Sequence, residues 1–340
     1  MVSNKESGCL IIAEAGVNHN GQLDMALDLV DAAANAGADV VKFQTFSAKN
    51  LVRPGAQKAE YQKQQTGSGD QFDMLKKLEL SPETHLIIQK RCIERGIEFM
   101  STPFDQEALD FLVGLGMKRI KIPSGEITNE PFLRNIASKN LPVILSTGAS
   151  TLSEVLRAQS VIQESQVMDL TILHCSSSYP ADLRDVNLRA MQTIAEHSKA
   201  PVGYSDHTLG ISVSVAAVAL GARVIEKHFT LDRRLIGPDH RASLLPGELS
   251  QLVDQIREVE LALGSPEKKP SETELAVRDL VRRSLTARRD FKSGELLLAR
   301  DIAILRPGTG IAPGSINQVV GKRLCRSIKE GDILQWSDLQ

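Results

Sequence analysis

Residues 202–230 read VGYSDHTLGISVSVAAVALGARVIEKHFT, and this stretch decides the fold. An apolar run leads to His207, a segment with apolar residues at three- and four-residue spacing follows, and a second apolar run leads to His228. This order predicts one strand–helix–strand step with two parallel strands side by side. Because neighbouring parallel strands end at the same edge, we expect the two imidazoles to lie together, as two ligands of one metal ion.

The same strand–helix step recurs along most of the chain. Helix-like segments such as residues 25–37 and 86–96 end in glycine, which is typical of a left-handed helix C-cap. Eight such units in about 250 residues predict a (β/α)8 TIM barrel over residues 1–264. An open doubly wound sheet is the alternative, but no GxGxxG turn follows the first run. The predicted strands are residues 9–13, 40–43, 97–100, 119–122, 142–145, 170–173, 202–204 and 224–225.

The composition is that of an ordinary globular protein and argues against several function classes. The 340 residues are 42% apolar and 24% charged, and 40 basic against 42 acidic side chains give a net charge of −2. No global field therefore favours nucleic acid or an anionic membrane. No apolar stretch is long enough to span a bilayer, and the four cysteines form no CxxC pair. We expect a cytoplasmic protein with reduced thiols and no nucleic-acid or membrane partner.

Every predicted strand ends in polar or ionisable residues. A barrel gathers these ends around one opening, where catalytic residues usually lie. Lys42 and Lys121, with hydroxyl groups nearby, predict a cationic wall that suits a phosphate or a phosphorylated carboxylate. A structural ion pair between Lys42 and Glu14, and a core position for His174, are alternative interpretations. The strand-end residues are Glu14, Lys42, Gln44, Ser101, Thr102, Lys121, Ser124, Glu126, Ser146, Thr147, His174, Ser205, His207, Glu226, Lys227 and His228.

Short motifs along the chain carry a resemblance to a known family. They are IIAEAGVNHNG (11–21), VVKFQTF (40–46), MSTPFD (100–105), KIPSGE (121–126), ILSTG (144–148), LHCSSSYP (173–180), GYSDHTLG (203–210), VIEKHFTLD (224–232) and GPDHRAS (237–243). In this order they resemble the sialic acid synthase family, whose enzymes make nine-carbon nonulosonic acids. The match covers nearly the whole chain, so it is more specific than any single motif.

The resemblance implies a reaction and a set of site residues. Phosphoenolpyruvate condenses with the open-chain aldehyde of an N-acylated mannosamine-type sugar on a divalent metal, usually Mn²⁺, with Mg²⁺ or Co²⁺ as alternatives. His207 and His228 would hold the metal, and Glu126 would be the acid–base group. Ser177 stands where some members carry Asn. The implied phosphoenolpyruvate-binding residues are Lys42, Thr102, Lys121, Ser124, Ser146 and Ser205, and the implied sugar-binding residues are Glu14, Gln44, Tyr179, Asp239 and Arg306.

The C-terminal part of the chain repeats itself. Residues 265–274, SPEKKPSETE, are polar and contain two prolines, which predicts a linker over residues 265–282. Beyond it, FKSGELLLARDI (291–302) aligns with IKEGDILQWSDL (328–339), which predicts a small, mostly β module over residues 283–340 with approximate two-fold symmetry. This module resembles the SAF, or antifreeze-like, domain of these synthases. The resemblance implies a domain-swapped homodimer in which Arg306 reaches the sugar bound by the partner.

The acceptor sugar separates the branches of the family. GPDHRAS (237–243) resembles the N-acetylneuraminate and legionaminate branches rather than the pseudaminate branch. We expect N-acetylmannosamine as the acceptor, with 2,4-diacetamido-2,4,6-trideoxymannose as the alternative, and residues 47–80 as the loop that shapes the acceptor pocket. Two other function classes stay open. One is a Schiff-base aldolase that uses Lys121 or Lys42 without a metal, and the other is a non-catalytic carbohydrate-binding barrel.

Overall fold

A computed structural model describes residues 8–165, 167 and 169–340, and the chain divides into two compact units. The first unit extends to Gly264 and the second runs from Ser265 to Gln340. In the part of the chain that is described, no helix is long and apolar enough to cross a membrane. The four cysteines are free, and only Cys325 is exposed.

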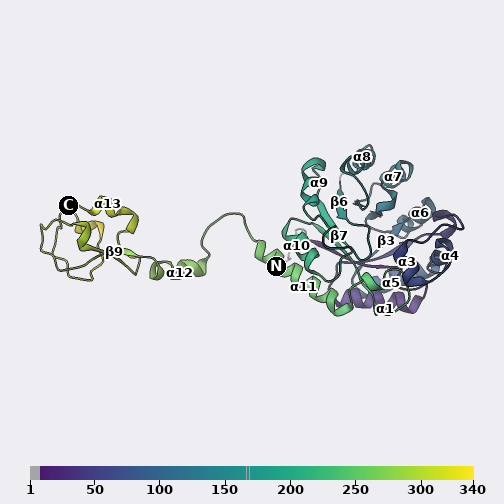
Figure 1. The fold of residues 1–340 in the computed structure, drawn as a ribbon, viewed down its shortest axis with the longest axis horizontal. Helices are drawn as coiled ribbons and strands as arrows, with labels where there is room; N and C mark the ends of the chain where they lie inside the picture. The colour runs from purple at the N-terminus through teal and green to yellow at the C-terminus, as the bar shows by residue number, and fades with distance from the viewer. Residues whose placement is uncertain (1–7, 166, 168) are drawn as a thin grey trace. The chain divides into compact units, whose positions relative to one another are not determined.

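Eight parallel strands form the core of the first unit (Figure 1). Their hydrogen-bonded order is β3-β2-β1-β8-β7-β6-β5-β4, so the first and the last strand pair and the sheet curls into a nearly closed barrel. The predicted barrel is therefore confirmed, and the open sheet is excluded. The strands are β1 (Leu10–Gly16), β2 (Val40–Thr45), β3 (Glu98–Pro103), β4 (Ile120–Ile122), β5 (Val143–Ser146), β6 (Leu170–Cys175), β7 (Val202–Asp206) and β8 (Val224–His228).

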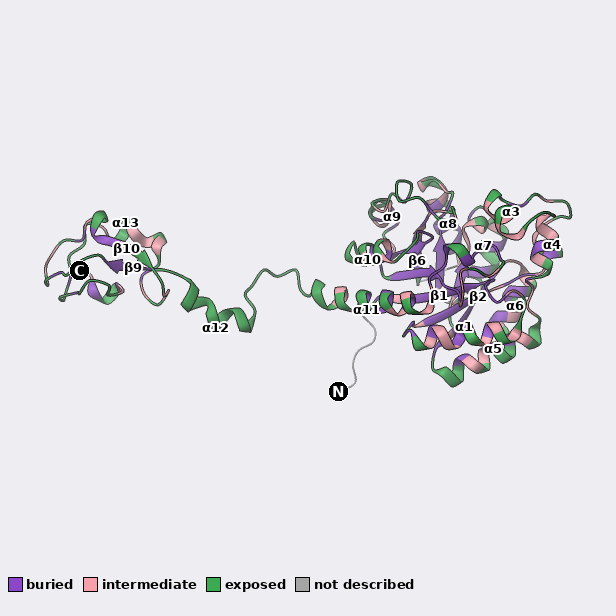
Figure 2. Cartoon of the chain, turned by 60° about the horizontal axis from the view of Figure 1, so that its bottom comes forward, coloured by how far each residue is buried: buried purple, intermediate pink, exposed green. Residues whose placement is uncertain are grey.

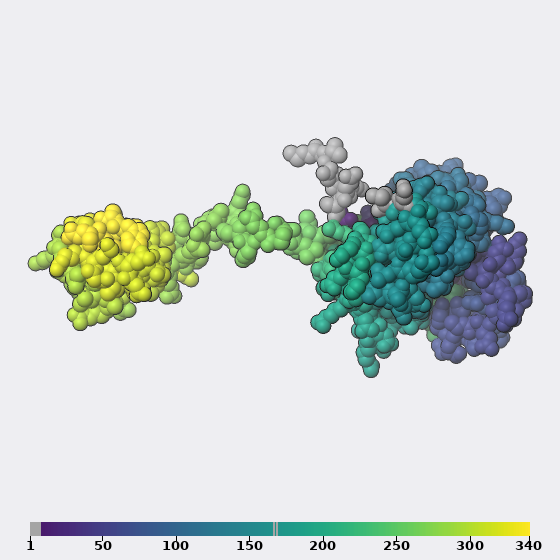
Figure 3. Space-filling view, turned by 90° about the horizontal axis from the view of Figure 1, so that it is seen from above, coloured from purple at the N-terminus to yellow at the C-terminus, as the bar shows by residue number. Residues whose placement is uncertain are grey.

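Helices lie outside the strands and bury one face against them. The strands are almost wholly buried in Figure 2, and in the space-filling view the teal, middle part of the chain forms a continuous outer surface (Figure 3). Gly96 ends one helix in the left-handed conformation, as the sequence predicts. The helices are α1 (Leu23–Asn35), α5 (Pro82–Arg95), α6 (Gln106–Gly114), α7 (Glu130–Ala137), α8 (Leu152–Gln163), α9 (Ala190–Ser198), α10 (Ser212–Ala219) and α11 (Pro246–Leu263).

Most strands run further toward their carboxyl ends than the apolar pattern predicts. The strand predicted to end at residue 225 continues to His228, and the one predicted to end at 204 continues to Asp206. The ladder pairs Ser205 with Glu226, so polar residues take strand conformation there. Because successive side chains of a strand point to opposite faces, these polar ends split between the barrel interior and the layer under the helices.

The long segment between β2 and α5 is folded into three short helices, α2 (Ala48–Leu51), α3 (Glu60–Thr66) and α4 (Gln71–Lys76). Asp70 caps the start of α4, where its side chain accepts a hydrogen bond from Asp73 N. Met74 and Leu78 pack with Val17 and Phe46 in a small apolar cluster of their own. This segment was predicted to shape the acceptor pocket, and its fold could not be derived from the sequence.

The second unit has its own small core and the expected internal symmetry. Its regular strands are β9 (Ser284–Ala287) and β10 (Ile302–Leu305), which pair antiparallel, and α13 (Ile316–Val319) is a short helix. Phe291 and Ile328, which start the two repeats, hydrogen-bond to each other. The repeats also contain equivalent ion pairs, Arg289 with Asp301 and Arg326 with Asp338. Helix α12 (Glu272–Val281) occupies much of the predicted linker, which is therefore partly helical.

Candidate active site

One cavity of about 260 Å³ lies among the residues at the carboxyl ends of the barrel strands. It brings together residues from the loop after β1 to the loop after β8, as a barrel mouth does. Every predicted site residue except Glu126 and Arg306 lines it. These lining residues are Glu14, Lys42, Gln44, Thr102, Lys121, Ser124, Ser146, Tyr179, Ser205, His207, His228 and Asp239.

Two lysines and two glutamates form a charged network in this cavity, which we call the cavity charge network. Lys42 Nζ lies 2.8 Å from Glu14 Oε2 and 3.6 Å from Glu226 Oε2. Lys121 Nζ lies 3.5 Å from Glu226 Oε1. All four side chains are buried. The alternative interpretation of Lys42 and Glu14 as an ion pair is thus correct, but the pair lines the cavity, so it does not exclude a role in binding.

The pKa values of the side chains in the cavity charge network are shifted in different directions. Burial acts to raise the pKa of Glu226, but the charges of Lys121 and Lys42 outweigh it and lower that pKa to about 2. Burial raises the pKa of Glu14, and Lys42 offsets only part of this effect. Burial also acts to lower the pKa of Lys42, but Glu14 and Glu226 outweigh it and raise that pKa. Relative to an exposed carboxylate, the ionised form is therefore favoured at Glu226 and disfavoured at Glu14, which weakens the negative charge that an anion entering beside the two lysines would meet.

Hydroxyl groups surround the lysines. Lys42 Nζ donates a hydrogen bond to Thr102 Oγ1 at 2.9 Å, and Lys121 Nζ donates to Ser146 Oγ at 2.7 Å. A phosphate or carboxylate that enters can take these same ammonium donors and add the hydroxyls, since charge-assisted bonds are the stronger ones. The other two predicted hydroxyls are Ser205, whose Oγ donates to Glu226 Oε1 at 3.2 Å, and Ser124, whose Oγ accepts from Gly148 N at 2.9 Å.

The two histidines lie side by side, with ring centroids 5.4 Å apart. His207 Nδ1 lies 2.7 Å from Ser176 O, and a proton on Nδ1 that donates to this carbonyl leaves Nε2 as the nitrogen with a free lone pair. His228 Nδ1 is buried and has no hydrogen-bond partner among the described residues. Burial lowers the pKa of His228 well below its usual range, so this imidazole is neutral, as a metal ligand must be.

This pair fits a divalent ion with open coordination positions. In the described ranges, no group of three or more His, Cys, Asp or Glu side chains is arranged to hold a metal. Substrate or water would therefore complete the coordination of an ion on His207 and His228. Burial acts to lower the pKa of His207, but nearby Cys175 outweighs it and raises that pKa, so a metal would compete with a proton at this ring.

The cavity residues predicted to hold the sugar are one aromatic side chain, Tyr179, and three polar side chains, Glu14, Gln44 and Asp239. The Tyr179 ring lies 4.1 Å from the His207 ring, centroid to centroid. Gln44 Nε2 donates to Glu14 Oε1 at 3.1 Å. Burial, together with the charge of Glu14, raises the pKa of Asp239 to about 7. A carboxyl group with such a pKa can give or take a proton at neutral pH.

Two predicted site residues do not join the cavity lining. Glu126 lies in the 3-10 helix η2 (Ser124–Glu126), where its Oε2 accepts a hydrogen bond from Asn129 Nδ2 at 2.7 Å. Its role as the acid–base group stays a prediction. Arg306 belongs to the second unit, and its role at the sugar also stays a prediction.

His174 is half-buried and lies outside the cavity lining, which agrees with the interpretation that it is not a ligand. Its Nε2 lies 2.7 Å from Val186 O, and its ring packs 5.7 Å from the Tyr204 ring. The backbone contact accounts for this histidine without a ligand.

Several residues that line the cavity were not assigned a role from the sequence. Glu226 is the most central, because it contacts both lysines, and its position two residues before His228 on the same strand face could have revealed it. Tyr61 stacks on Tyr179 with ring centroids 5.3 Å apart, and Gln62 follows it on α3. We call the remaining apolar lining the apolar wall, formed by Val17, Met74, Leu75, Leu78 and Phe104.

The comparison with known proteins agrees with this geometry. The model of the NeuB family matches residues 29–268, and that of the SAF domain matches residues 282–340. The chain is 54% identical to the N,N'-diacetyllegionaminic acid synthase of Legionella pneumophila, over 98% of this chain and 95% of that one. It is 47% identical to the enzyme of the same name from Campylobacter jejuni, over 96% and 98% of the two chains.

A solved structure agrees as well. The crystal structure of the N-acetylneuraminic acid synthetase of Leptospira borgpetersenii, in complex with citrate, superposes with a TM-score of 0.71 at 36% identity, over 79% of this chain and 90% of that one. The resemblance inferred from the motifs is confirmed, as is the expectation of an enzyme. The chain belongs to the NeuB family of nonulosonic acid synthases, enzymes that condense phosphoenolpyruvate with a sugar, and it ends in a SAF domain.

Proposed function

We propose that this chain condenses phosphoenolpyruvate with 2,4-diacetamido-2,4,6-trideoxymannose to give N,N'-diacetyllegionaminic acid. The two legionaminic acid synthases are 54% and 47% identical to it, whereas the N-acetylneuraminic acid synthetase is 36% identical. This ranking favours the acceptor that we first gave as the alternative over N-acetylmannosamine. The sequence motifs alone did not separate the two.

The proposed reaction class rests on one observation. A single cavity contains both Lys42 and Lys121, which we call the lysine wall, and the paired imidazoles of His207 and His228. Lys42 and Lys121 suit the phosphate and carboxylate groups of phosphoenolpyruvate. The aldehyde of the sugar then lies within the same small volume, so the two reacting carbons are held together rather than meeting from solution. A binding protein without chemistry has no need to bury two charged lysines and two carboxylates in its pocket.

The residues divide the chemistry between them. The lysine wall holds phosphoenolpyruvate while C3 of phosphoenolpyruvate attacks the aldehyde carbon of the sugar. Water then adds at C2 of the phosphoenolpyruvate unit, and phosphate leaves as the C2–O bond breaks. Glu14 and Asp239 are the lining carboxyl groups with raised pKa values, so they are the best placed to supply the proton that the new hydroxyl group needs. Tyr179 and Gln44 would position the sugar.

We further propose that His207 and His228 bind a divalent ion, Mn²⁺ in preference to Mg²⁺ or Co²⁺. Such an ion would polarise the aldehyde oxygen of the acceptor. The neutral ring of His228 and the hydrogen bond that fixes the His207 ring support this assignment.

A domain-swapped homodimer, with Arg306 near the N-acyl group of the sugar bound by the partner, is the proposed assembly, and the cytoplasm is the proposed compartment. Sedimentation at working concentration would test the assembly, because a monomer with full activity would contradict it.

A phosphate-release assay tests the proposed acceptor. Phosphoenolpyruvate is supplied with 2,4-diacetamido-2,4,6-trideoxymannose, with N-acetylmannosamine or with N-acetylmannosamine 6-phosphate. We expect the first sugar to give the highest kcat/KM. A higher value for either of the other two would contradict the proposal.

Chelation separates the metal-dependent reaction from the Schiff-base alternative. That alternative has some support, since burial lowers the pKa of Lys121 and so favours its nucleophilic neutral form. We expect EDTA to abolish turnover, added Mn²⁺ to restore it, and borohydride to trap no pyruvate adduct. Full activity in EDTA, or an adduct on Lys121, would contradict the proposed metal.

A further inference from the structure

We infer that the apolar wall receives the C6 methyl group of the acceptor and thereby sets the preference for a 6-deoxy sugar over a 6-hydroxy sugar. This inference rests on the proposed function, which it deepens by naming the residues that recognise one end of the acceptor.

The apolar wall is a built surface rather than a few scattered side chains. Val17, Met74 and Leu78 are buried and pack in one cluster that is separate from the main core of the barrel. Phe104 packs edge-on against Phe46, with ring centroids 6.0 Å apart, and Phe46, which does not line the cavity, thus supports the wall. The wall therefore keeps its shape when a ligand enters, because its members are held by each other.

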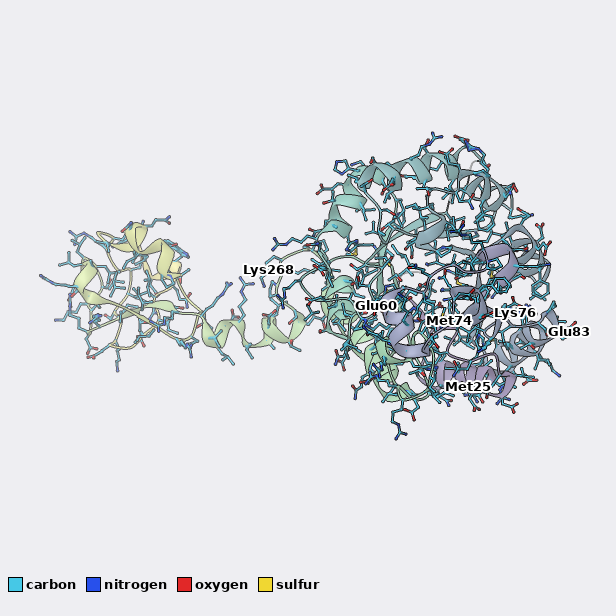
Figure 4. The ribbon with its side chains drawn as sticks, turned by 45° about the vertical axis from the view of Figure 1, so that its right-hand side comes forward. Met25, Glu60, Met74, Lys76, Glu83 and Lys268 are labelled. Carbon is cyan, nitrogen blue, oxygen red and sulfur yellow. The ribbon has the colours of Figure 1, made fainter. Side chains whose placement is uncertain are left out.

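The folded insertion after β2 supplies most of this surface. Met74 and Leu75 lie on α4, and Leu78 follows that helix. Figure 4 labels Met74 together with Lys76 from the same helix. Asp70 fixes the start of α4 through its hydrogen bond to Asp73 N at 2.8 Å. The wall thus depends on a segment that lies outside the strands carrying the charged residues.

The charged lining and the apolar wall come from different parts of the chain. Most of the lysines, carboxylates and imidazoles of the lining lie on barrel strands, whereas most of the apolar wall comes from α4 and the residues after it and presents no side-chain donor or charge. A hydroxyl group turned toward it would lose its hydrogen bonds to water without replacement, and a methyl group would lose none. The wall therefore discriminates against a polar group at whichever sugar carbon faces it.

The C6 methyl group fits this wall better than an acetamido group does. An acetamide carries an N–H and a C=O next to its methyl, and both need partners when they are buried. Tyr61 and Gln62, which line the cavity from α3, offer a hydroxyl and an amide for such a group. C6 of the 6-deoxy sugar has no polar atom, so it is the part of the acceptor that loses least against purely apolar side chains.

Two sugars that differ only at C6 isolate this contact. They are 2-acetamido-2,6-dideoxymannose and N-acetylmannosamine, each assayed with phosphoenolpyruvate by phosphate release. We expect the wild-type chain to prefer the 6-deoxy sugar by about 10- to 100-fold in kcat/KM, the range that one buried apolar group provides in a specificity pocket. Equal kcat/KM values for the two sugars, or a preference for the hydroxylated one, would overturn the inference.

Two variants locate the preference in the wall. Leu75→Gln changes a half-buried side chain and should therefore affect the stability of the fold little, whereas Met74→Gln changes a buried side chain. We expect each to lower the 6-deoxy to 6-hydroxy ratio by about 10-fold, because the new amide can pair with a C6 hydroxyl. The KM for phosphoenolpyruvate should not change, since the lysine wall is intact.

A matched control is available on α1. Met25→Gln makes the same chemical change at a half-buried methionine that does not line the cavity and is labelled separately from Met74 in Figure 4. This variant should leave the ratio of kcat/KM for the 6-deoxy and 6-hydroxy sugars unchanged. If Leu75→Gln and Met74→Gln reduce turnover of both sugars equally, the wall has only a structural role and the inference is wrong. The proposed function fails on a different result, namely when the diacetamido sugar is not the best acceptor of the wild-type chain.

Discussion

Two buried lysines at the mouth of the barrel have opposite surroundings. Lys42 lines the cavity beside Glu14 and Glu226, while Lys227 lies in the layer between strands and helices beside Asp206. Both lysines are equally inaccessible to water, with 2% and 1% of their surface exposed. Burial therefore does not distinguish a functional lysine from a structural one, and the difference must come from what surrounds each ammonium group.

The network around Lys227 is closed. Its Nζ donates to Asp206 Oδ2 at 2.8 Å and to Thr208 O at 2.6 Å. Asp206 Oδ1 accepts from the backbone N and the hydroxyl of Thr208, and Oδ2 also accepts from Ser214 Oγ at 2.6 Å. Every strong partner is internal to the protein, so the group stabilises the fold and has little capacity left for a ligand.

The cavity charge network is open by contrast. Glu226 Oε2 is buried, and among the described residues it has no hydrogen-bond partner and only a 3.6 Å ion pair with Lys42 Nζ. Glu14 Oε2 has the same ammonium group as a partner, at 2.8 Å. Their lysine partners face the cavity. Unsatisfied buried polar atoms are costly, and sites that retain them are commonly functional. Between these two lysine networks, the difference lies in the partners that face a cavity and are incompletely paired, and not in charge or burial.

The largest expected effect comes from Lys42→Met. We expect kcat/KM for phosphoenolpyruvate to fall by about 10²- to 10³-fold, because an ammonium group that stabilises the developing charge is lost. The free energy of unfolding should fall by less than in the closed network, since Lys121 remains beside Glu226 and burial already raises the pKa of Glu14. Steady-state kinetics and urea unfolding measure the two. A large loss of stability with unchanged kinetics would contradict the proposed difference between Lys42 and Lys227.

Lys227→Met is the matched substitution in the closed network. Asp206 would be left as a buried charge without a cation, so we expect a loss of about 3–5 kcal/mol in the free energy of unfolding. The folded fraction should keep a near-normal KM for phosphoenolpyruvate, which lies outside this network. Urea unfolding of the two lysine variants, measured side by side, tests this difference directly. Equal free energies of unfolding would contradict it.

Asp239, which also lines the cavity, allows the comparison to be tested through the pH dependence of stability. Its pKa is raised from the usual 3.8 to about 7 in the folded chain, so folding favours the protonated form. The stability from this proton is complete below pH 3.8 and is lost as the pH rises to about 7. In Asp239→Asn this loss should be absent, so the difference in unfolding free energy between wild type and variant should shift in favour of the variant over that range. A difference that is flat with pH would show that Asp239 is ionised throughout.

Two serines give the smallest effects. Ser214→Ala removes a donor to Asp206 and should cost about 1 kcal/mol of stability with unchanged kinetics. Ser146→Ala removes the acceptor of Lys121 and should raise the KM for phosphoenolpyruvate several-fold, with stability nearly unchanged. The same two assays apply to both variants. If both serines affect stability and neither affects KM, the two networks are equivalent after all.

The barrel and most of its site could be predicted from the sequence, for a physical reason. Apolar runs such as residues 143–145 must be buried on both faces, and a parallel strand with helices on its outer side is the element that allows it. Because all such strands end at one mouth, naming the polar residue after each strand already gives Lys42, Lys121 and the two histidines. The side on which each residue lies also follows from alternation along the strand, and using that rule would have found Glu226.

Other parts of the site could not be predicted. The apolar wall joins Val17 and Phe104 to residues of α4, and no local pattern connects these three places in the chain. The carboxylate of Glu126 is adjacent to the site in sequence, yet a hydrogen bond to Asn129 holds it away from the cavity lining. Side-chain hydrogen bonds of this kind depend on exact positions, which periodicity does not contain.

The sequence by itself determined the order of strands and helices, the family and the residue types available to the site. Only the tertiary structure decided which buried lysine has a closed set of partners and which faces a cavity, and how residues 47–80 fold to supply part of the cavity lining. The reason is that periodicity records which side of a strand or helix avoids water, whereas hydrogen-bond partners and cavity walls arise from groups far apart in the chain that meet only after folding.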